Sequence, residues 1–275
     1  MSGANYFDDN FAINAYMDSS VPVSTQRAIQ EHQNIQKALQ QAGIEVVKVA
    51  PPPHCQDGVY TANWGLIKDN KVVLSHLPNK RKKEEPYAKK TLQDLGFETT
   101  VCPYRFSGQG DALPCGDVLF IGTNYRTDPE AHRFVADKLG FKTVSLTTIP
   151  KLSPNNQPVI NAVTGWADSF FYDIDLALAV ISPNLIAWCR EAFTPGSQKV
   201  IEELDIDKIE VSFSEATKGF ACNLVSTGET VVMSTNAPKL QSAIEAKGLK
   251  TITPDVTELS KGGGYIRCTS LTLTN

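Results

Sequence analysis

The feature that most constrains the fold is a short pattern that recurs along the chain. A helical stretch ends in Gly and a β-branched strand follows at once, as in QKALQQAGIEVVKV at Gly43, KTLQDLGFETTVC at Gly96, FVADKLGFKTVSL at Gly140 and QSAIEAKGLKTITP at Gly248. A weaker fifth copy, KVIEELDIDKIEV, has Asp205 where the glycine would stand. Helices often end in a residue with a left-handed backbone, which glycine adopts without strain. The pattern therefore predicts five helix–turn–strand units.

Further strand-like stretches lie between the copies, so each unit is expected to contain several strands and one helix. These stretches are residues 59–67, 71–75, 118–122, 176–181, 223–226 and 230–233. Such units form either an open α/β sheet or a closed ring, and a helix–Gly–strand step by itself is common in every α/β protein. Five near-equal units without a nucleotide-binding glycine loop favour the ring. We therefore predict a five-bladed, pseudo-fivefold α/β propeller formed by residues 1–275 as a single domain, in which loops from equivalent strands meet near the axis.

The composition excludes several classes of protein. With 26 Lys and Arg against 30 Asp and Glu, the net charge of -4 argues against a nucleic-acid partner. The longest apolar run, residues 176–181, is far shorter than the roughly 20 residues that span a bilayer. The opening MSGANYFDDN lacks the basic start and apolar core of a secretory signal, and no two of the six cysteines have the spacing of a zinc or thioredoxin site. We therefore expect a reduced, cytoplasmic protein that binds neither membranes nor nucleic acid.

The C-terminal segment GGGYIRCTSLTL contains the strongest candidate for a nucleophile. Three glycines, which permit close approach of the backbone, stand just before Cys268, and the cationic Arg267 is its neighbour. This setting is typical of a cysteine presented as a thiolate. The alternative is a buried structural cysteine on the last strand.

Two other segments carry polar residues in places where a ligand could bind. In FSGQGDALPCGDVLFIGTNYRTD, Asp111 follows a tight glycine turn and either holds a cation or caps the turn. Arg126 precedes a helix expected to start near Asp128, and it either binds a carboxylate or pairs at the surface. In DGVYTANWGLI, Asn63 interrupts a strand-like run, so its amide is either a structural hydrogen bonder or a ligand contact.

The segment FFYDIDLALAVI places two carboxylates at the start of an apolar run. In a strand, Asp173 and Asp175 would point to the same side. Two like charges entering a buried strand would raise one pKa or require a cationic ligand between them. The alternative is a pair of solvated acids at the mouth of a strand.

Taken together, five segments in this order resemble the guanidine-modifying amidinotransferase superfamily, which includes arginine deiminase, dimethylarginine dimethylaminohydrolase and the arginine dihydrolases. FAINAYMD resembles the opening INPWMD pattern, and VYTAN resembles the F-T-A-N strand. GQGDAL with FIGTNYRTD resembles the EGGD loop and its following RTD segment, YDIDLAL resembles YHLDTAL, and GGGYIRC resembles the segment that carries the nucleophile. The resemblance covers nearly the whole chain and implies a ring of five ββαβ units.

The resemblance also implies a role for each matching residue. Cys268 would attack the amidino carbon of a guanidinium and form a covalent thiouronium, which water hydrolyses or an amine accepts. Asn63, Asp111 and Asp175 match positions that bind the guanidinium, and Arg126 matches the substrate pocket. The family's acid–base histidine stands where this chain has Asp173, which we take as its catalytic replacement. The glutamate usual before the glycine turn is Ser107.

These departures shape the functional expectation. An Asp at position 173 could transfer protons near pH 7 only with a strongly raised pKa, so we expect weak deiminase activity, which Asp173→His would raise. Of the four histidines, His54 is the one expected to reach the pocket. We predict a hydrolase of the guanidinium group of an arginine-like small molecule, without metal or organic cofactor, and we leave both a monomer and a homodimer open. The alternatives are a guanidino-binding protein without turnover and an enzyme of this fold with another substrate.

Overall fold

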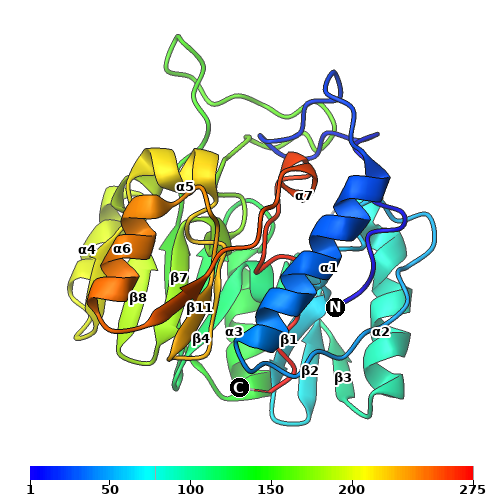
Figure 1. Cartoon of the computed structure of the whole chain (residues 1–275), viewed down its shortest axis with the longest axis horizontal. Helices are drawn as coiled ribbons and strands as arrows, with labels where there is room; N and C mark the ends of the chain where they lie inside the picture. The colour runs from blue at the N-terminus through cyan, green and yellow to red at the C-terminus, as the bar shows by residue number, and fades with distance from the viewer. Residues whose placement is uncertain (78, 275) are drawn as a thin grey trace.

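The computed structural model describes residues 1–77 and 79–274 and contains four three-stranded sheets with one shared topology (Figure 1). In each sheet the first strand pairs antiparallel with the second, and the second pairs parallel with the third. The sheets are β1 (Gly65–Lys68), β2 (Lys71–Leu74) and β3 (Glu98–Val101); β4 (Ala112–Cys115), β5 (Val118–Thr123) and β6 (Lys142–Thr147); β7 (Leu178–Ser182), β8 (Leu185–Trp188) and β9 (Asp207–Glu210); and β10 (Val225–Ser226), β11 (Thr230–Val232) and β12 (Lys250–Ile252).

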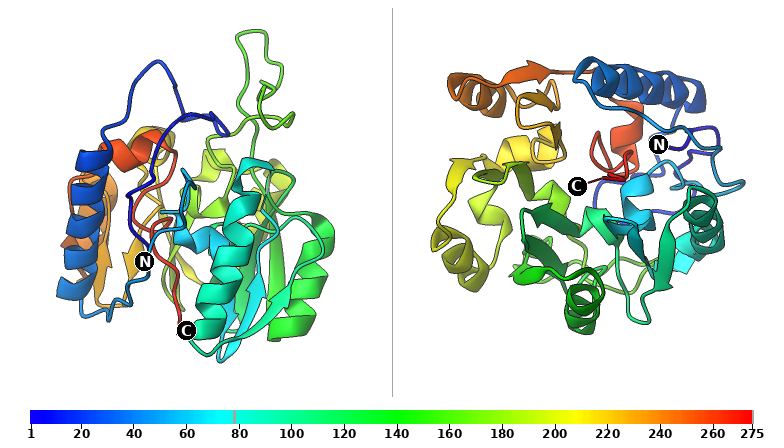
Figure 2. Two further views of the ribbon diagram at one scale, coloured as in Figure 1. Left: turned by 90° about the vertical axis from the view of Figure 1, so that its right-hand side faces the viewer. Right: turned by 90° about the horizontal axis from the view of Figure 1, so that it is seen from below.

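One helix connects the second and third strands of each sheet, because two parallel neighbours need a long crossover. These helices are α2 (Glu84–Asp94), α3 (Pro129–Leu139), α4 (Pro195–Glu202) and α6 (Pro238–Ala246). With α1 (Thr25–Gln41) they form the outside of a ring, and the C-terminal segment lies near its centre (Figure 2, right). The predicted five-unit ring is therefore present.

The fifth unit joins the two ends of the chain. After α1, the extended segment 44–49 hydrogen-bonds to the N-terminus, from the Met1 amine to the Val47 oxygen at 2.9 Å and from the Val49 amide to the Met1 oxygen at 3.0 Å. No strand is assigned to this segment, so the strand expected after Gly43 is an extended segment without a regular ladder. Leu271 and Leu273 pack against a cluster formed by Ile67, Val72, Leu74 and Leu92, which places the C-terminal segment against the first sheet.

Glycine ends four of the five helices as predicted. Gly43, Gly96, Gly140 and Gly248 have left-handed φ angles of +88°, +92°, +69° and +84°. Helix α4 lacks the glycine, and its capping residue Glu203 keeps an ordinary right-handed backbone (φ -76°). The turn after α4 therefore closes without the left-handed residue that the other copies use.

Three predicted strands begin later than expected, and all three corrections concern the candidate site. Residues 223–226 form a strand only over β10, after Asn223. Residues 59–67 begin with a 3-10 turn, η1 (Thr61–Trp64), before β1, and residues 176–181 begin at the end of another, η4 (Ile174–Leu176), before β7. Asn63 and Asp175 therefore lie in turns, and Asp173 caps η4 from an extended backbone. The side chains of Asn63 and Asp175 contact Asp173 and Cys268 elsewhere in the ring, and a buried amide or carboxylate must be satisfied wherever its partner lies. The prediction that Asp173 and Asp175 share one face of a strand is wrong.

The remaining elements are short. They are η2 (Asn79–Lys83), η3 (Gly108–Gly110), η5 (Arg190–Ala192), α5 (Phe213–Gly219) and α7 (Glu258–Lys261). Two long loops, residues 5–23 and 149–169, rise at the same end of the molecule (Figure 1). No helix in the described part of the chain is long and apolar enough to cross a membrane.

Candidate active site

Polar residues occupy equivalent places in successive units. Just before the first strand of each sheet stand Asn63 (β1), Asp111 (β4), Asp175 (β7) and Asn223 (β10). All four side chains are buried. The fifth unit supplies Cys268, whose carbonyl oxygen accepts a hydrogen bond from the Ala62 amide at 3.1 Å. The ring thus brings residues that are far apart in the sequence to one place, as the repeat predicted.

Cys268 lies beside a carboxylate and an amide. Its Sγ is 3.3 Å from Oδ2 of Asp175, and Nδ2 of Asn223 donates to Sγ at 3.1 Å. Oδ1 of Asn223 also accepts from the backbone amides of Cys268 and Tyr265, both at 3.1 Å. Asn223 therefore fixes both the backbone and the sulfur of Cys268. Sequence reasoning missed Asn223, although its place before the fourth sheet matches Asn63 in the first.

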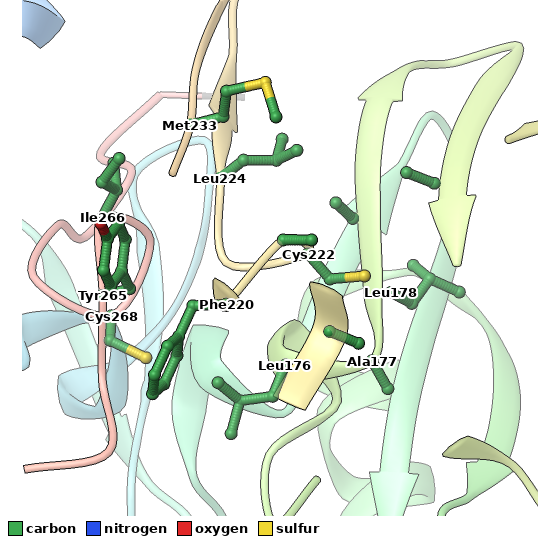
Figure 3. Close-up of a cluster of buried hydrophobic side chains, with 14 of the residues drawn as sticks. Leu176, Ala177, Leu178, Phe220, Cys222, Leu224, Met233, Tyr265, Ile266 and Cys268 are labelled. Atoms are coloured by element: carbon green, nitrogen blue, oxygen red, sulfur yellow. The ribbon is translucent and has the colours of Figure 1, made fainter. Parts of the chain in front are cut away.

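The other face of Cys268 is apolar. Figure 3 shows Cys268 beside Phe220 and Tyr265, at the edge of a cluster of buried hydrophobic side chains. The rings of Phe220 and Tyr265 stack with centroids 5.4 Å apart. A Cβ at Gly264 would lie 2.9 Å from that of Cys268 and 2.5 Å from the Tyr60 ring, so the glycine is required for this close approach.

Asp173 and its partners form a second polar group. Oδ2 of Asp173 accepts from Nδ2 of Asn63 at 2.9 Å and lies 3.6 Å from Nη1 of Arg126. The Arg126 guanidinium stacks over the ring of Tyr172, 4.0 Å from its centroid. Asp111 is joined to the same turn, because its Oδ1 accepts from the backbone amide of Ile174 at 2.9 Å. All six predicted site residues therefore converge in one buried region.

Two carboxylate oxygens of this cluster have no hydrogen-bond partner among the described residues. They are Oδ1 of Asp173 and Oδ1 of Asp175, and both side chains are at most 1% exposed. A buried acceptor without a donor costs about 1–3 kcal/mol and more when it is charged. The arrangement therefore favours a ligand that brings hydrogen-bond donors and positive charge.

Burial dominates the electrostatics of the cluster. Burial, and then the charge of Asp173, raises the pKa of Asp175 to about 8 and that of Asp111 well above its usual range. Burial, and then the charges of Asp175 and Asp173, raises the pKa of the Cys268 thiol. The thiolate expected beside Arg267 is therefore not favoured in the free protein. The Arg267 guanidinium instead donates to Gln109 at 3.0 Å.

A buried arginine, also missed from the sequence, holds Asn63 in place. Arg81 donates to Oδ1 of Asn63 at 2.7 Å and makes two 2.8 Å bonds to the carboxylate of Glu84. With Oδ1 accepting from Arg81, Nδ2 of Asn63 is directed at Asp173 and at the oxygens of Ser107, both 2.9 Å away. The RKKE spacing at the start of α2, with charges three residues apart, was the available signal.

His54 does not reach the cluster, contrary to the expectation. It is exposed, has a φ of +59°, and packs its ring against Tyr6 at 5.6 Å. All six cysteines are free and buried. No group of three or more His, Cys, Asp or Glu side chains within residues 1–77 and 79–274 is arranged to hold a metal ion.

A cavity of about 660 Å³ adjoins the cluster. It is lined by residues of β4, β7 and β10 and by the C-terminal segment, and it reaches Asp175 and Arg267. Asp175 therefore contacts Cys268 with one oxygen and also lines an open space.

Comparison with known proteins agrees with this geometry. Residues 4–274 match the family model described as "N,N dimethylarginine dimethylhydrolase, eukaryotic". The chain belongs to this family. It is 30% identical over 273 residues, 98% of its length, to N(G),N(G)-dimethylarginine dimethylaminohydrolase of Mycobacterium tuberculosis, of which it covers 84%. The family also places it in the amidinotransferase superfamily, as the motifs indicated.

Solved structures share the fold over all or nearly all of the chain. The chain is 28% identical to the bifunctional arginine dihydrolase/ornithine cyclodeaminase ArgZ of Synechocystis sp., of which it spans 37%. It matches the crystal structure of the N-terminal domain of ArgZ, described as an arginine dihydrolase bound to product, with a TM-score of 0.89 over 100% of this chain and 97% of that one. A structure of dimethylarginine dimethylaminohydrolase from Pseudomonas aeruginosa, 20% identical, has the same fold with a TM-score of 0.73.

Proposed function

We propose that the protein hydrolyses the guanidinium group of an arginine-like small molecule through a covalent intermediate on Cys268. The observation that carries this proposal is a cluster of buried carboxylates with unpartnered oxygens around a buried thiol. Asp173 and Asp175 each keep one oxygen without a partner in the described structure, and Asp175 contacts Sγ. A guanidinium is planar, cationic and rich in N–H donors, so it would satisfy both oxygens at once and lie against the sulfur.

The same cation would activate the nucleophile. Burial and two neighbouring carboxylates raise the pKa of Cys268, so the thiol is protonated in the free protein. A guanidinium beside Asp175 would offset those negative charges and lower the pKa of the thiol. The protein would thus form its thiolate only when the substrate is bound. Cys268 would then attack the amidino carbon, release an amine, and leave a thiouronium for water to hydrolyse.

Each remaining side chain has a role consistent with its contacts. Asp111 and Asp175 would bind the guanidinium, and Asn63 would hold Asp173 in position. Arg126, buried against Tyr172, would face the distal part of the substrate. An arginine at this place suits a substrate that ends in a carboxylate.

The relatives support this reaction class. Two of them are named for the hydrolysis of dimethylarginine and of arginine. A solved structure of a variant of the ArgZ N-terminal domain is described as covalently bound to a reaction intermediate, and its chain is 28% identical to this one. Which amine leaves, ammonia or a methylated amine, is the specificity that distinguishes the two named activities.

The proposal is tested by trapping the intermediate. The protein is mixed with arginine, with N,N-dimethylarginine and with shorter guanidines, quenched in acid and analysed by intact-mass and peptide-mapping mass spectrometry. We expect an adduct on Cys268 and release of ammonia or dimethylamine. Cys268→Ser should abolish both, whereas Cys102→Ser, at a buried cysteine of the separate apolar cluster that contains Phe106, should retain them. Absence of both adduct and amine with every guanidine would refute the proposal.

A further inference from the structure

The proposed reaction needs a group that moves protons, and the histidines do not supply one. The ring nitrogens of His132 are hydrogen-bonded to the Ser145 hydroxyl at 2.7 Å and to the Gly122 carbonyl oxygen at 2.9 Å. His32 is buried on α1. His54 is exposed, and His76 pairs through its backbone with Phe106. No contact joins any of these rings to Cys268 within the described residues. The carrier of the proton must therefore be sought among the other groups at the sulfur.

Asp173, which stands in the place of the family histidine, is already engaged. Oδ2 accepts from Nδ2 of Asn63 at 2.9 Å and lies 3.6 Å from Nη1 of Arg126, so this carboxylate is hydrogen-bonded and ion-paired within the protein. Arg81, which is paired with Glu84, donates to Oδ1 of Asn63 and so fixes the orientation of the Asn63 amide. A group that must gain and lose a proton in each turnover is poorly served by such an environment.

Asp175, like Asp173, keeps its Oδ1 without a partner among the described residues, but it differs from Asp173 in what its other oxygen contacts. It is 1% exposed, its Oδ2 lies 3.3 Å from Sγ of Cys268, and its Oδ1 has no partner in the described part of the chain. The charged groups that act on it are Asp173, Asp111 and Arg267, and the neighbouring ionisable groups are Cys268, Cys222 and Tyr16. Among the described residues, these acids outnumber Arg267, the cation that acts on Asp175, so the protonated carboxyl is accessible near neutral pH.

We propose that Asp175 is the acid–base group of this enzyme, carrying the proton between the Cys268 thiol and the departing nitrogen. This inference rests on the proposed guanidine hydrolysis. It assigns to the guanidinium-binding carboxylate the task that an imidazole performs in the family pattern. Asp173 becomes a positioning residue that holds its neighbours.

In the first half-reaction, which forms the thiouronium, Asp175 is the one group needed to accept and return the proton. As Sγ attacks the amidino carbon, the C–S bond forms and the thiol proton passes to Oδ2 of Asp175. The C–N bond of the neutral tetrahedral adduct then breaks, and Asp175 gives this proton to the leaving nitrogen, so that a neutral amine departs and a cationic thiouronium remains. The carboxylate is regenerated at the end of this half-reaction.

The second half-reaction uses the same carboxylate. Water adds to the thiouronium carbon and gives a proton to Asp175, the C–S bond breaks, and a urea-type product forms. One proton returns to the Cys268 sulfur, and a second leaves to solvent, where the amine takes it up. The cavity of about 660 Å³ that reaches Asp175 provides room for water beside this carboxyl.

The test separates proton transfer from binding by changing the leaving group. A guanidine releases an amine that must be protonated, whereas the S-alkyl isothiourea with the same side chain releases a thiolate that needs no proton. Both are cations and use the same binding contacts. The ratio of kcat/KM on the two substrates therefore isolates leaving-group protonation from binding.

We expect Asp175→Asn to lower kcat/KM on the guanidine at least about 100-fold more than on the isothiourea, the scale of general acid catalysis. Asp173→Asn, the matched control two residues away, should lower both equally. Equal losses for Asp175→Asn would overturn the inference, as would a selective loss for Asp173→Asn. Melting curves verify that both variants fold, and Asp175→Glu, which restores the carboxyl, should recover part of the selectivity.

Tyr16 provides the competing donor that the experiment must exclude. Its hydroxyl is buried without a partner among the described residues, and its ring packs 4.6 Å from Phe220. Tyr16→Phe should leave the substrate ratio unchanged, and a selective loss there would reassign the donor. Turnover by the wild type separates a failure of the proton role proposed for Asp175 from a failure of the proposed guanidine hydrolysis. Wild-type turnover with an unselective Asp175→Asn refutes the proton role alone, whereas neither adduct nor amine release by the wild type on any guanidine refutes the function.

Discussion

If the carboxylate cluster requires a cation before Cys268 becomes nucleophilic, a cationic alkylating reagent should select this cysteine. The reagent is 2-chloroacetamidine, and 2-chloroacetamide is its neutral counterpart. One charge-assisted hydrogen bond to an unpartnered oxygen of Asp175 contributes about 1.5–3 kcal/mol. At about 1.4 kcal/mol per factor of ten, that corresponds to a selectivity of roughly 10- to 150-fold for the cation.

The assay is alkylation at pH 7 followed by peptide mapping of all six cysteines. Each rate is divided by that reagent's rate with the denatured protein, which removes intrinsic reactivity. We expect Cys268 to react far faster with the amidine than Cys55, Cys102, Cys115, Cys189 or Cys222, all of them buried. Asp175→Asn should reduce the preference for the cation. Equal labelling of the cysteines, or equal normalised rates for both reagents, would refute the reasoning.

Three further predictions concern the surroundings of the site. Gly110→Ala should lower the initial rate at least about tenfold, because the added Cβ would lie 2.4 Å from Nδ2 of Asn63, which donates to Asp173. Gly196→Ala, where the added Cβ meets open space, should leave the initial rate unchanged. Arg81→Met should lower the free energy of unfolding in urea by about 3–5 kcal/mol, because it leaves a buried carboxylate unpaired, while Lys90→Met at an exposed pair should cost under about 1 kcal/mol. The folded-state pKa of Asp175 is raised to about 8 from 3.8, so its neutral form stabilises the fold at acidic pH and this stability is lost as pH rises towards 8. Asp175→Asn should therefore melt higher than wild type at pH 8, by more than about 2 °C, with a smaller difference at pH 5; the opposite trend would contradict the raised pKa.

The repeat made the ring predictable because its signals are local. A helix end, a glycine and a β-branched run lie within a dozen residues, and the backbone angles at Gly43 and Gly140 follow from the residue type. Closure of five such units near one axis then brings Asn63, Asp111 and Cys268 together without any knowledge of side-chain contacts.

The turns at the site were not predictable from the same pattern. Asn63 and Asp175 lie in runs that read as strands, yet their hydrogen bonds and those of Asp173 go to residues elsewhere in the ring. The bond from Asn63 to Asp173 spans 110 residues, and the contact between Cys268 and Asp175 spans 93. Partners at such separations override local strand propensity, because a buried amide or carboxylate must be satisfied wherever its partner lies.

The sequence by itself determined the order of the units, the helix ends and the residue types available for chemistry. Only the tertiary structure decided their surroundings: a Cys268 thiol whose pKa burial raises, an Asp173 paired with Asn63 and Arg126, and an Asp175 in contact with the sulfur. The physical reason is that protonation depends on burial and on the charges that folding brings within a few ångströms. Residue spacing along the chain encodes neither quantity, so the likeness of YDIDLAL to its family pattern located the site without revealing which carboxyl is placed to carry the proton.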